Sequence, residues 1–183
     1  MARATAQKDP TPGEDLWVFG YGSLMWRPGF DYVDTRPAKI YGWHRSFCVY
    51  SWYHRGSEEK PGLVLGLDRG GSCIGRAYRV RAADAPDVVA YLDAREMVTA
   101  VYQPIAANIH TDAGKMVARC YIADRAHPQY AGKLPYDIQA EIIRKGTGHS
   151  GINVDYLASL VEHLDVLGIR DGPLHAVHEL VFG

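Results

Sequence analysis

The segment Leu16-Trp17-Val18-Phe19-Gly20-Tyr21-Gly22-Ser23 joins a short apolar run to a glycine-rich turn. Four consecutive apolar residues that stop at turn residues are typical of a fully buried strand. The two glycines favour a sharp exit from that strand, because residues without a Cβ reach backbone conformations closed to others. We therefore predict a buried strand over 16–19 whose turn emerges from the core.

Further strand-like segments follow this first one. Aromatic and β-branched residues recur between turn residues, which is typical of antiparallel strands. The segments cover residues 38–53, 62–67, 74–80, 101–110 and 115–123. Turns are predicted between them, including Asp68-Arg69-Gly70-Gly71 and Thr111-Asp112-Ala113-Gly114.

One helix is predicted among the strands and two more after them. Asp84 can cap a helix that has Pro86 in its first turn and that runs to about Glu96. The later helices cover about 136–144 and 153–167. This order lacks the strict strand–helix alternation of a doubly wound sheet. It favours the α+β class: a small, mixed, mostly antiparallel β-barrel with peripheral helices.

Composition limits the organisation and the partners of the chain. With 183 residues, 47% of them hydrophobic, it is long enough for one domain, expected over 16–183 after a disordered leader over 1–15. The 20 basic and 21 acidic side chains form no basic stripe, so nucleic acid is not an expected partner. No apolar run approaches the ~20 residues of a membrane span, and a cytoplasmic location is expected.

The glycine turn is the first candidate site. Its backbone amides can point outward and approach a ligand closely, and such a loop can hold an anion or an oxyanion. The alternative is that Gly20 and Gly22 only make the turn. Neither a dinucleotide fingerprint nor a phosphate-binding loop is present, and Ser23 is not in a nucleophile elbow.

Glu96 is the second candidate. Val88, Leu92 and Glu96 follow one another at intervals of four residues, so the carboxylate continues the apolar stripe of the predicted helix. An inward carboxylate loses hydration, which raises its pKa and suits it to proton transfer near neutral pH. The alternatives are an ion pair with Arg95 or another arginine, or a solvated residue at a helix end.

Histidines and cysteines give weaker signals. His175 and His178 are three residues apart, but no third ligand follows at a recognisable spacing, so we predict no metal site. Three widely spaced cysteines, Cys48, Cys73 and Cys120, fit neither a disulfide framework nor a zinc site. Buried thiols are the favoured interpretation.

Several of these segments together resemble the ChaC family of glutathione-specific γ-glutamylcyclotransferases. The resemblance begins with the long motif at 17–30 and covers nearly all of the chain after residue 15. It continues in the order of the family through His54-Arg55-Gly56, Pro61-Gly62, Gly75-Arg76-Ala77-Tyr78-Arg79, Arg95-Glu96-Met97-Val98-Thr99, His127-Pro128-Gln129-Tyr130 and Gly148-His149-Ser150-Gly151-Ile152-Asn153.

The resemblance implies a small β-barrel with helices and an enzyme that cleaves glutathione to 5-oxoproline and Cys-Gly without a cofactor. It implies that the loop Tyr21, Gly22, Ser23 and Leu24 holds the γ-glutamyl group and that Glu96 is catalytic. Arg55 and Tyr121 match residues that the family places near the substrate. The oligomeric state is not implied.

Two positions depart from the family pattern. Ser51 stands where some members have an acidic residue, and the segment from Met97 to Tyr102 replaces the glycine-glycine-tyrosine of animal forms. The chain therefore resembles the bacterial branch of the family more than the animal branch.

Two other functions stay open at this point. One is a cyclotransferase for other γ-glutamyl amino acids or amines, and the other is a non-catalytic, ligand-binding regulatory domain.

Overall fold

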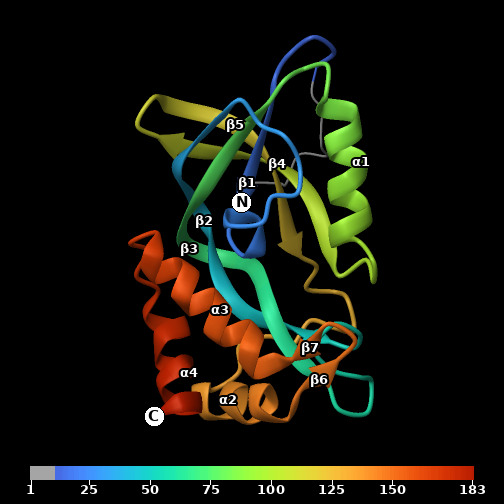
Figure 1. Ribbon diagram of the computed structural model, residues 1–183, viewed down its shortest axis with the longest axis vertical. Coiled ribbons are helices and arrows are strands. Elements are labelled where there is room, and N and C mark those ends of the chain that lie inside the picture. The colour runs from blue at the N-terminus through green and yellow to red at the C-terminus, as the bar shows by residue number, and fades with distance from the viewer. Residues whose placement is uncertain (1–10) are drawn as a thin grey trace. The chain divides into compact units, whose positions relative to one another are not determined.

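The computed structural model describes residues 11–183 (Figure 1). Residues 1–10 of the predicted leader lie outside the described residues. Five strands form a closed barrel in the order β1-β3-β2-β4-β5. They are β1 (Leu16–Gly20), β2 (Asp34–Ser51), β3 (Gly62–Val80), β4 (Tyr102–Thr111) and β5 (Gly114–Ala123). With its helices, this barrel confirms the predicted α+β class.

Strand β1 lies between β3 and β5. It pairs antiparallel with β3, from Leu16 opposite Val80 to Gly20 opposite Arg76, and parallel with β5, where Val18 lies opposite Arg119. Val18 and Phe19 have no exposed surface, which confirms the predicted buried strand. A short 3₁₀ turn, η1 (Ser23–Met25), follows at the end of the strand.

The sequence predicts that a turn at Asp68-Arg69-Gly70-Gly71 separates two strands, and this prediction is wrong. The structure has one strand, β3, from Gly62 to Val80. Gly70 and Gly71 take φ values of 103° and 67°, a left-handed region that glycine reaches at little cost. The backbone can therefore bend at these residues while the strand continues on either side.

Helix α1 (Ala85–Glu96) packs on the barrel strands and ends at the residue that the sequence indicates (Figure 1). Val88 and Leu92 are buried against residues of β1, β3 and β5 in one apolar cluster. Asp84 occupies the N-cap position, but its side chain accepts no capping hydrogen bond. Burial of the apolar stripe, more than capping, therefore holds this helix in place.

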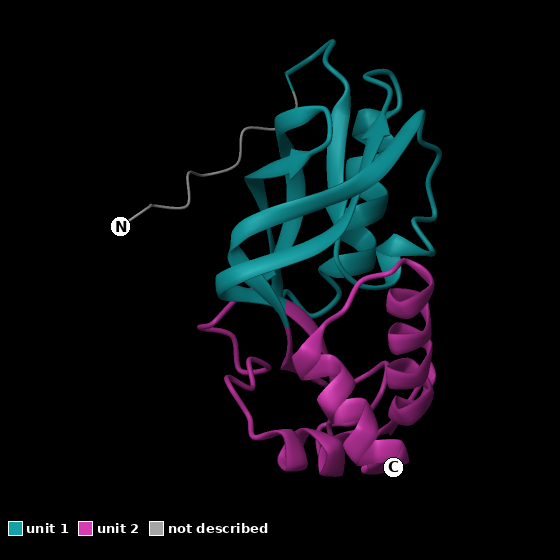
Figure 2. Cartoon of the chain, turned by 90° about the vertical axis from the view of Figure 1, so that its left-hand side faces the viewer, with its two compact units in different colours: residues 1–45, 67–122 teal, residues 46–66, 123–183 magenta. Residues whose placement is uncertain are grey.

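The described chain divides into two compact units (Figure 2). Unit 1 comprises the described residues up to Arg45 together with Leu67–Ile122, and it contains β1, η1, α1 and β4. Unit 2 comprises Ser46–Gly66 and Ala123–Gly183. Strands β2 and β3 each run from one unit into the other along the chain. The single domain expected over 16–183 stays a prediction.

Unit 2 contains three helices that pack on one another. They are α2 (Tyr136–Lys145), α3 (Asn153–Val166) and α4 (Gly172–Phe182), with the short strands β6 (Thr147–Gly148) and β7 (Gly151–Ile152) between α2 and α3. The sequence predicts α2 and α3 but not α4. The Asp171 side chain caps α4 by accepting a hydrogen bond from the backbone N–H of Leu174. This Asp-Gly-Pro start was the available signal for the missed helix.

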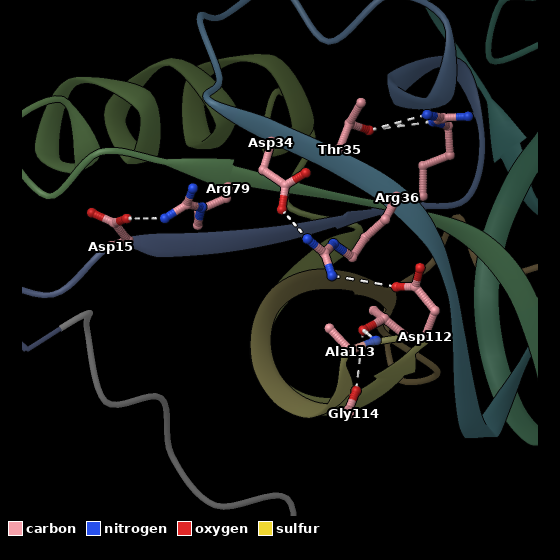
Figure 3. A network of polar contacts seen from close by, with 10 residues as sticks. Asp15, Asp34, Thr35, Arg36, Arg79, Asp112, Ala113 and Gly114 are labelled. Carbon is pink, nitrogen blue, oxygen red and sulfur yellow. Dashed lines mark hydrogen bonds and ion pairs between the residues drawn. The ribbon is translucent and has the colours of Figure 1, made fainter.

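Several ion pairs lie on the barrel surface of unit 1 (Figure 3). The Arg36 guanidinium lies between the carboxylates of Asp34 and Asp112, and Arg79 pairs with Asp15 at 3.1 Å. Because these groups are partly exposed, each pair contributes little to stability. Among the helices of residues 11–183, none has the length and apolar character needed to cross a membrane.

Candidate active site

The glycine-rich loop consists of Tyr21, Gly22, Ser23 and Leu24. Two buried side chains of unit 1 donate hydrogen bonds to backbone carbonyl groups of this loop and of Met25, which follows it. Arg45 on β2 donates from Nε to the carbonyl oxygen of Tyr21 at 2.6 Å. The hydroxyl of Tyr78 on β3 donates to the carbonyl oxygens of Leu24 and Met25, both at 2.8 Å. Buried carbonyl groups require such donors, so the loop has a defined conformation.

Close contact between β1 and β3 also shapes the start of the loop. A Cβ on Gly75 would lie 2.2 Å from the carbonyl oxygen of Gly20 and 2.9 Å from the ring of Phe19. Only glycine fits this position without displacing backbone. Beyond it, no described residue accepts a hydrogen bond from the backbone N–H of Gly22 or Ser23. Two amides without a described protein acceptor are candidates for binding a ligand.

Glu96 is the last residue of α1, and its side chain is 18% exposed. Val88 and Leu92, on the same face of α1, are 6% and 0% exposed. The Glu96 carboxylate continues this buried face and is therefore mostly shielded from bulk water. Burial raises the pKa of Glu96, and the charge of Arg95 opposes that rise. The Glu96 charge in turn adds to the effect of burial in raising the pKa of the Cys120 thiol on β5.

Arg95 connects the glycine-rich loop to this carboxylate within unit 1. Its Nη2 donates to the Ser23 hydroxyl at 2.8 Å, and its Nε lies 3.5 Å from Glu96 Oε1. The ion pair that the sequence offers as an alternative role for Glu96 is therefore present. It coexists with a mostly buried carboxylate whose pKa remains above its ordinary value.

Tyr121 on β5 is 2% exposed, and its hydroxyl belongs to a polar cluster against α1. It donates to Asp93 Oδ1 at 2.6 Å and accepts from Arg119 Nε at 2.9 Å. Arg119 Nη2 also donates to Asp93 Oδ1, at 2.6 Å. Asp93 is one helical turn before Glu96, so the cluster fixes the part of α1 that carries the candidate base.

Arg55, which the resemblance places near the substrate, belongs to unit 2. Its Nη1 donates to the carbonyl oxygens of Ser150 and Ile152, at 2.7 and 3.3 Å. Its backbone N–H donates to the hydroxyl of buried Ser51 at 2.9 Å. These contacts show Arg55 and Ser51 fastening loops of unit 2, and a substrate contact by Arg55 stays a prediction.

Four residues around the loop and α1 were missed as members of the site: Arg45, Tyr78, Asp93 and Arg119. A signal existed for Arg45, because it shares a strand face with Phe47 and Val49, which are 1% exposed. An arginine on an apolar strand face indicates buried acceptors. No spacing rule links Asp93 to Arg119, which are 26 residues apart.

The cysteines are buried thiols, as predicted, with exposures between 0% and 4%. Burial raises the pKa of Cys120, the opposite of what a nucleophilic thiol needs. His175 is hydrogen-bonded to Asp165 at 2.9 Å in unit 2, which is the ordinary role expected for it.

The model of the ChaC-like protein family matches residues 16–182. The chain belongs to the ChaC-like family. The matched range contains both the loop and Glu96, and excludes only the first 15 residues and the last one.

Relatives of this ChaC-like chain come from bacteria and animals. It is 36% identical to the glutathione-specific γ-glutamylcyclotransferase of Escherichia coli strain K12 over 161 residues, covering 87% of this chain and 70% of that protein. It is 35% identical to glutathione-specific γ-glutamylcyclotransferase 1 of Homo sapiens, covering 91% and 78%. The crystal structure of a yeast γ-glutamyl cyclotransferase specific to glutathione superposes with a TM-score of 0.83 at 25% identity, covering 91% and 95%.

Proposed function

We propose that this ChaC-like protein cleaves glutathione to 5-oxoproline and Cys-Gly by intramolecular aminolysis, with Glu96 as the general acid and base. The relatives that carry this activity in their names support the reaction. The observation that carries the role of Glu96 is a carboxylate that is 18% exposed, has a raised pKa, and is joined through Arg95 to the loop.

The reaction needs only groups that the substrate and the chain contain. The α-amine of the γ-glutamyl group attacks its own γ-carbonyl carbon. A C–N bond forms in a five-membered lactam while the bond to the cysteine nitrogen breaks. Attacker and target share one residue, so a loop that holds the glutamyl chain folded can supply an effective molarity on the order of 10⁵ M or more. Tyr21, Gly22, Ser23 and Leu24 are the residues we assign to that task.

Proton transfer is the task assigned to Glu96. The α-amine is an ammonium group at neutral pH and becomes nucleophilic only after it loses a proton. The attacking nitrogen loses two protons between ammonium and lactam N–H, and the departing nitrogen of Cys-Gly gains two in becoming an ammonium group. The Glu96 carboxylate accepts one of these protons and then donates it to the departing nitrogen, while the other exchanges with solvent, so the residue ends in its starting state. A raised pKa brings the acid and base forms closer in free energy, which suits a residue that must do both.

Charge that develops on the γ-carbonyl oxygen needs hydrogen-bond donors. The backbone N–H groups of Gly22 and Ser23 are suited to this, because neither donates to another described residue. Arg45 and Tyr78 hold the carbonyl groups of the same loop, so the amides keep their direction during the reaction. The loss of one such donor typically costs about 3 kcal/mol of transition-state stabilisation.

Tyr121 supports this site through Asp93 and Arg119, and its hydroxyl is engaged with both. We propose that it acts on the substrate region mainly by holding α1.

The three buried thiols are compatible with a reducing compartment, which supports the cytoplasmic location expected from the sequence.

The proposal is tested by incubating the protein with glutathione, γ-glutamylalanine and γ-glutamyl-lysine in parallel, and by measuring 5-oxoproline and the released amine. Release of 5-oxoproline and Cys-Gly from glutathione, with little product from the other two, is expected. Turnover of the other donors in preference to glutathione would replace the substrate assignment. Absence of 5-oxoproline from every donor would favour a non-catalytic binding domain.

The pH dependence of kcat/KM tests the base. Activity is expected to fall as pH decreases through the pKa of Glu96, since protonation removes the base. Because burial raises that pKa, the acid limb should lie above the ordinary glutamate value of 4.5. An acid limb at or below that value would contradict the assignment of the sheltered carboxylate.

A further inference from the structure

The guanidinium of Arg95 pairs with Glu96 and also donates hydrogen bonds to the glycine-rich loop and to the segment that follows it. Its Nη1 donates to the carbonyl oxygens of Arg27 and Pro28 at 2.7 and 3.1 Å, and it lies 3.1 Å from the hydroxyl of Tyr91. Its Nη2 donates to the Ser23 hydroxyl at 2.8 Å. Four oxygen atoms from η1, the segment after it and α1 thus surround one planar group.

The Nε edge of the Arg95 guanidinium faces the carboxylate of Glu96, the candidate base. Arg95 Nε lies 3.5 Å from Glu96 Oε1, and both side chains are mostly buried, at 21% and 18% exposure. The Arg95 charge also lowers the pKa of Glu96 against the larger effect of burial. On β5, the Cys120 thiol interacts electrostatically with Glu96, and burial raises the pKa of this thiol, so it stays neutral.

We propose that Arg95 is a positioning residue for the cyclisation, which fixes the distance between the glycine-rich loop and the Glu96 carboxylate. This inference rests on the proposed function and adds to it a residue that acts through others. The loop orients the γ-glutamyl group and Glu96 moves the proton, so their separation decides whether the base reaches the α-amine. Arg95 contacts both partners directly.

The geometry requires arginine and not merely a positive charge. A guanidinium presents its N–H groups in a rigid, planar fork, so it can donate to Ser23, Arg27 and Pro28 while one edge faces Glu96. A lysine ammonium is a single point on a flexible stem and can satisfy only part of this set. A purely structural explanation also exists, because a cation in the last turn of a helix stabilises that helix.

Two substitutions separate positioning from charge. Arg95→Lys keeps the cation near Glu96 and disrupts the fork. It should lower kcat/KM for glutathione by about 100-fold, the typical cost of misplacing reacting groups by about 1 Å, and leave the acid limb of the pH profile near its parental position. Arg95→Gln removes the charge as well, which raises the pKa of Glu96 further and should shift the acid limb to higher pH.

A matched control is Arg81→Lys, at an exposed arginine in unit 1 before α1. This variant should keep parental kinetics. Thermal unfolding of all variants accompanies the assay, because a helix-stabilising role alone would lower stability while leaving kcat/KM and the acid limb unchanged in the protein that remains folded.

Hydrogen exchange gives a measurement that does not depend on turnover. The backbone amides of Met25, Trp26 and Arg27 donate within this loop, and they should exchange faster in Arg95→Lys than in Arg81→Lys. If the parent protein releases no 5-oxoproline from any donor, the proposed function fails, and the exchange rates alone decide whether Arg95 holds the loop. Parental exchange, or kcat/KM within about threefold of the parent in Arg95→Lys, would overturn the positioning role.

Discussion

Tyr78 offers a direct test of how the glycine-rich loop is held. Its hydroxyl donates to two carbonyl oxygens, those of Leu24 and Met25, each at 2.8 Å, and its side chain is 2% exposed. Burial raises the pKa of Tyr78 to about 12, so the hydroxyl remains a donor at any ordinary assay pH. Tyr78→Phe removes this donor and leaves the ring.

The expected cost follows from these two contacts. Leaving a buried acceptor without its donor typically costs about 1–3 kcal/mol, and the ring retains its apolar contacts. We therefore expect Tyr78→Phe to lower the free energy of unfolding by about 2 kcal/mol, or the melting temperature by about 4–8 °C. Urea and thermal unfolding measure this change, and kcat/KM should fall with it because the loop amides lose their fixed direction.

The matched control is Tyr32→Phe. Tyr32 is 44% exposed, and its ring packs edge-on against Tyr78 with centroids 5.0 Å apart. Loss of its hydroxyl should change the free energy of unfolding by less than about 0.5 kcal/mol. A similarly small change in Tyr78→Phe, with parental activity, would refute the claim that this hydroxyl supports the loop.

Two further predictions concern charged groups. Asp93→Asn removes the charge that pairs with Arg119, whose side chain is 4% exposed, and should lower the free energy of unfolding in urea by about 2 kcal/mol; no change would show that Arg119 does not depend on the pair. The Asp165 carboxylate raises the pKa of His175, so the stability that this pair contributes is present below the ordinary histidine pKa and lost as pH rises through the raised one. The stability difference between the parent and His175→Gln should therefore be larger at about pH 5.5 than at about pH 8.5, and a difference independent of pH would contradict this.

Much of the fold follows from local patterns. The buried run at Leu16 to Phe19 and the apolar stripe of α1 are short-range features, so the sequence predicts them within a few residues. The continuity of β3 through Gly70 and Gly71 could not be read from the same patterns, because glycine pairs occur both in turns and in bends of a strand. The helix α4 was missed despite its capping aspartate, since Leu180, Val181 and Phe182 at its end are consecutive apolar residues, and a short apolar run does not distinguish a helix from a strand.

The candidate site divides in a similar way. Glu96 could be predicted as a sheltered residue because helical periodicity extends from Val88 through Leu92 to it. Its connection to Ser23 through Arg95 depends on two segments 72 residues apart, and the sequence contains no rule for that pairing. The same holds for Tyr78 and the carbonyl groups that it supports. Tertiary structure alone reveals which carbonyl groups of the loop Arg45 and Tyr78 hold.

The most direct test of the central claim replaces the Glu96 carboxylate by an amide of the same shape. Glu96→Gln should remain folded and bind glutathione with an affinity similar to that of the parent, because the amide leaves the loop contacts of Arg95 in place. Its release of 5-oxoproline and Cys-Gly at saturating glutathione should fall by a factor of about 100 or more, the range attributed to a general acid or base. Release of Cys-Gly by Glu96→Gln at nearly the parental rate would contradict the account.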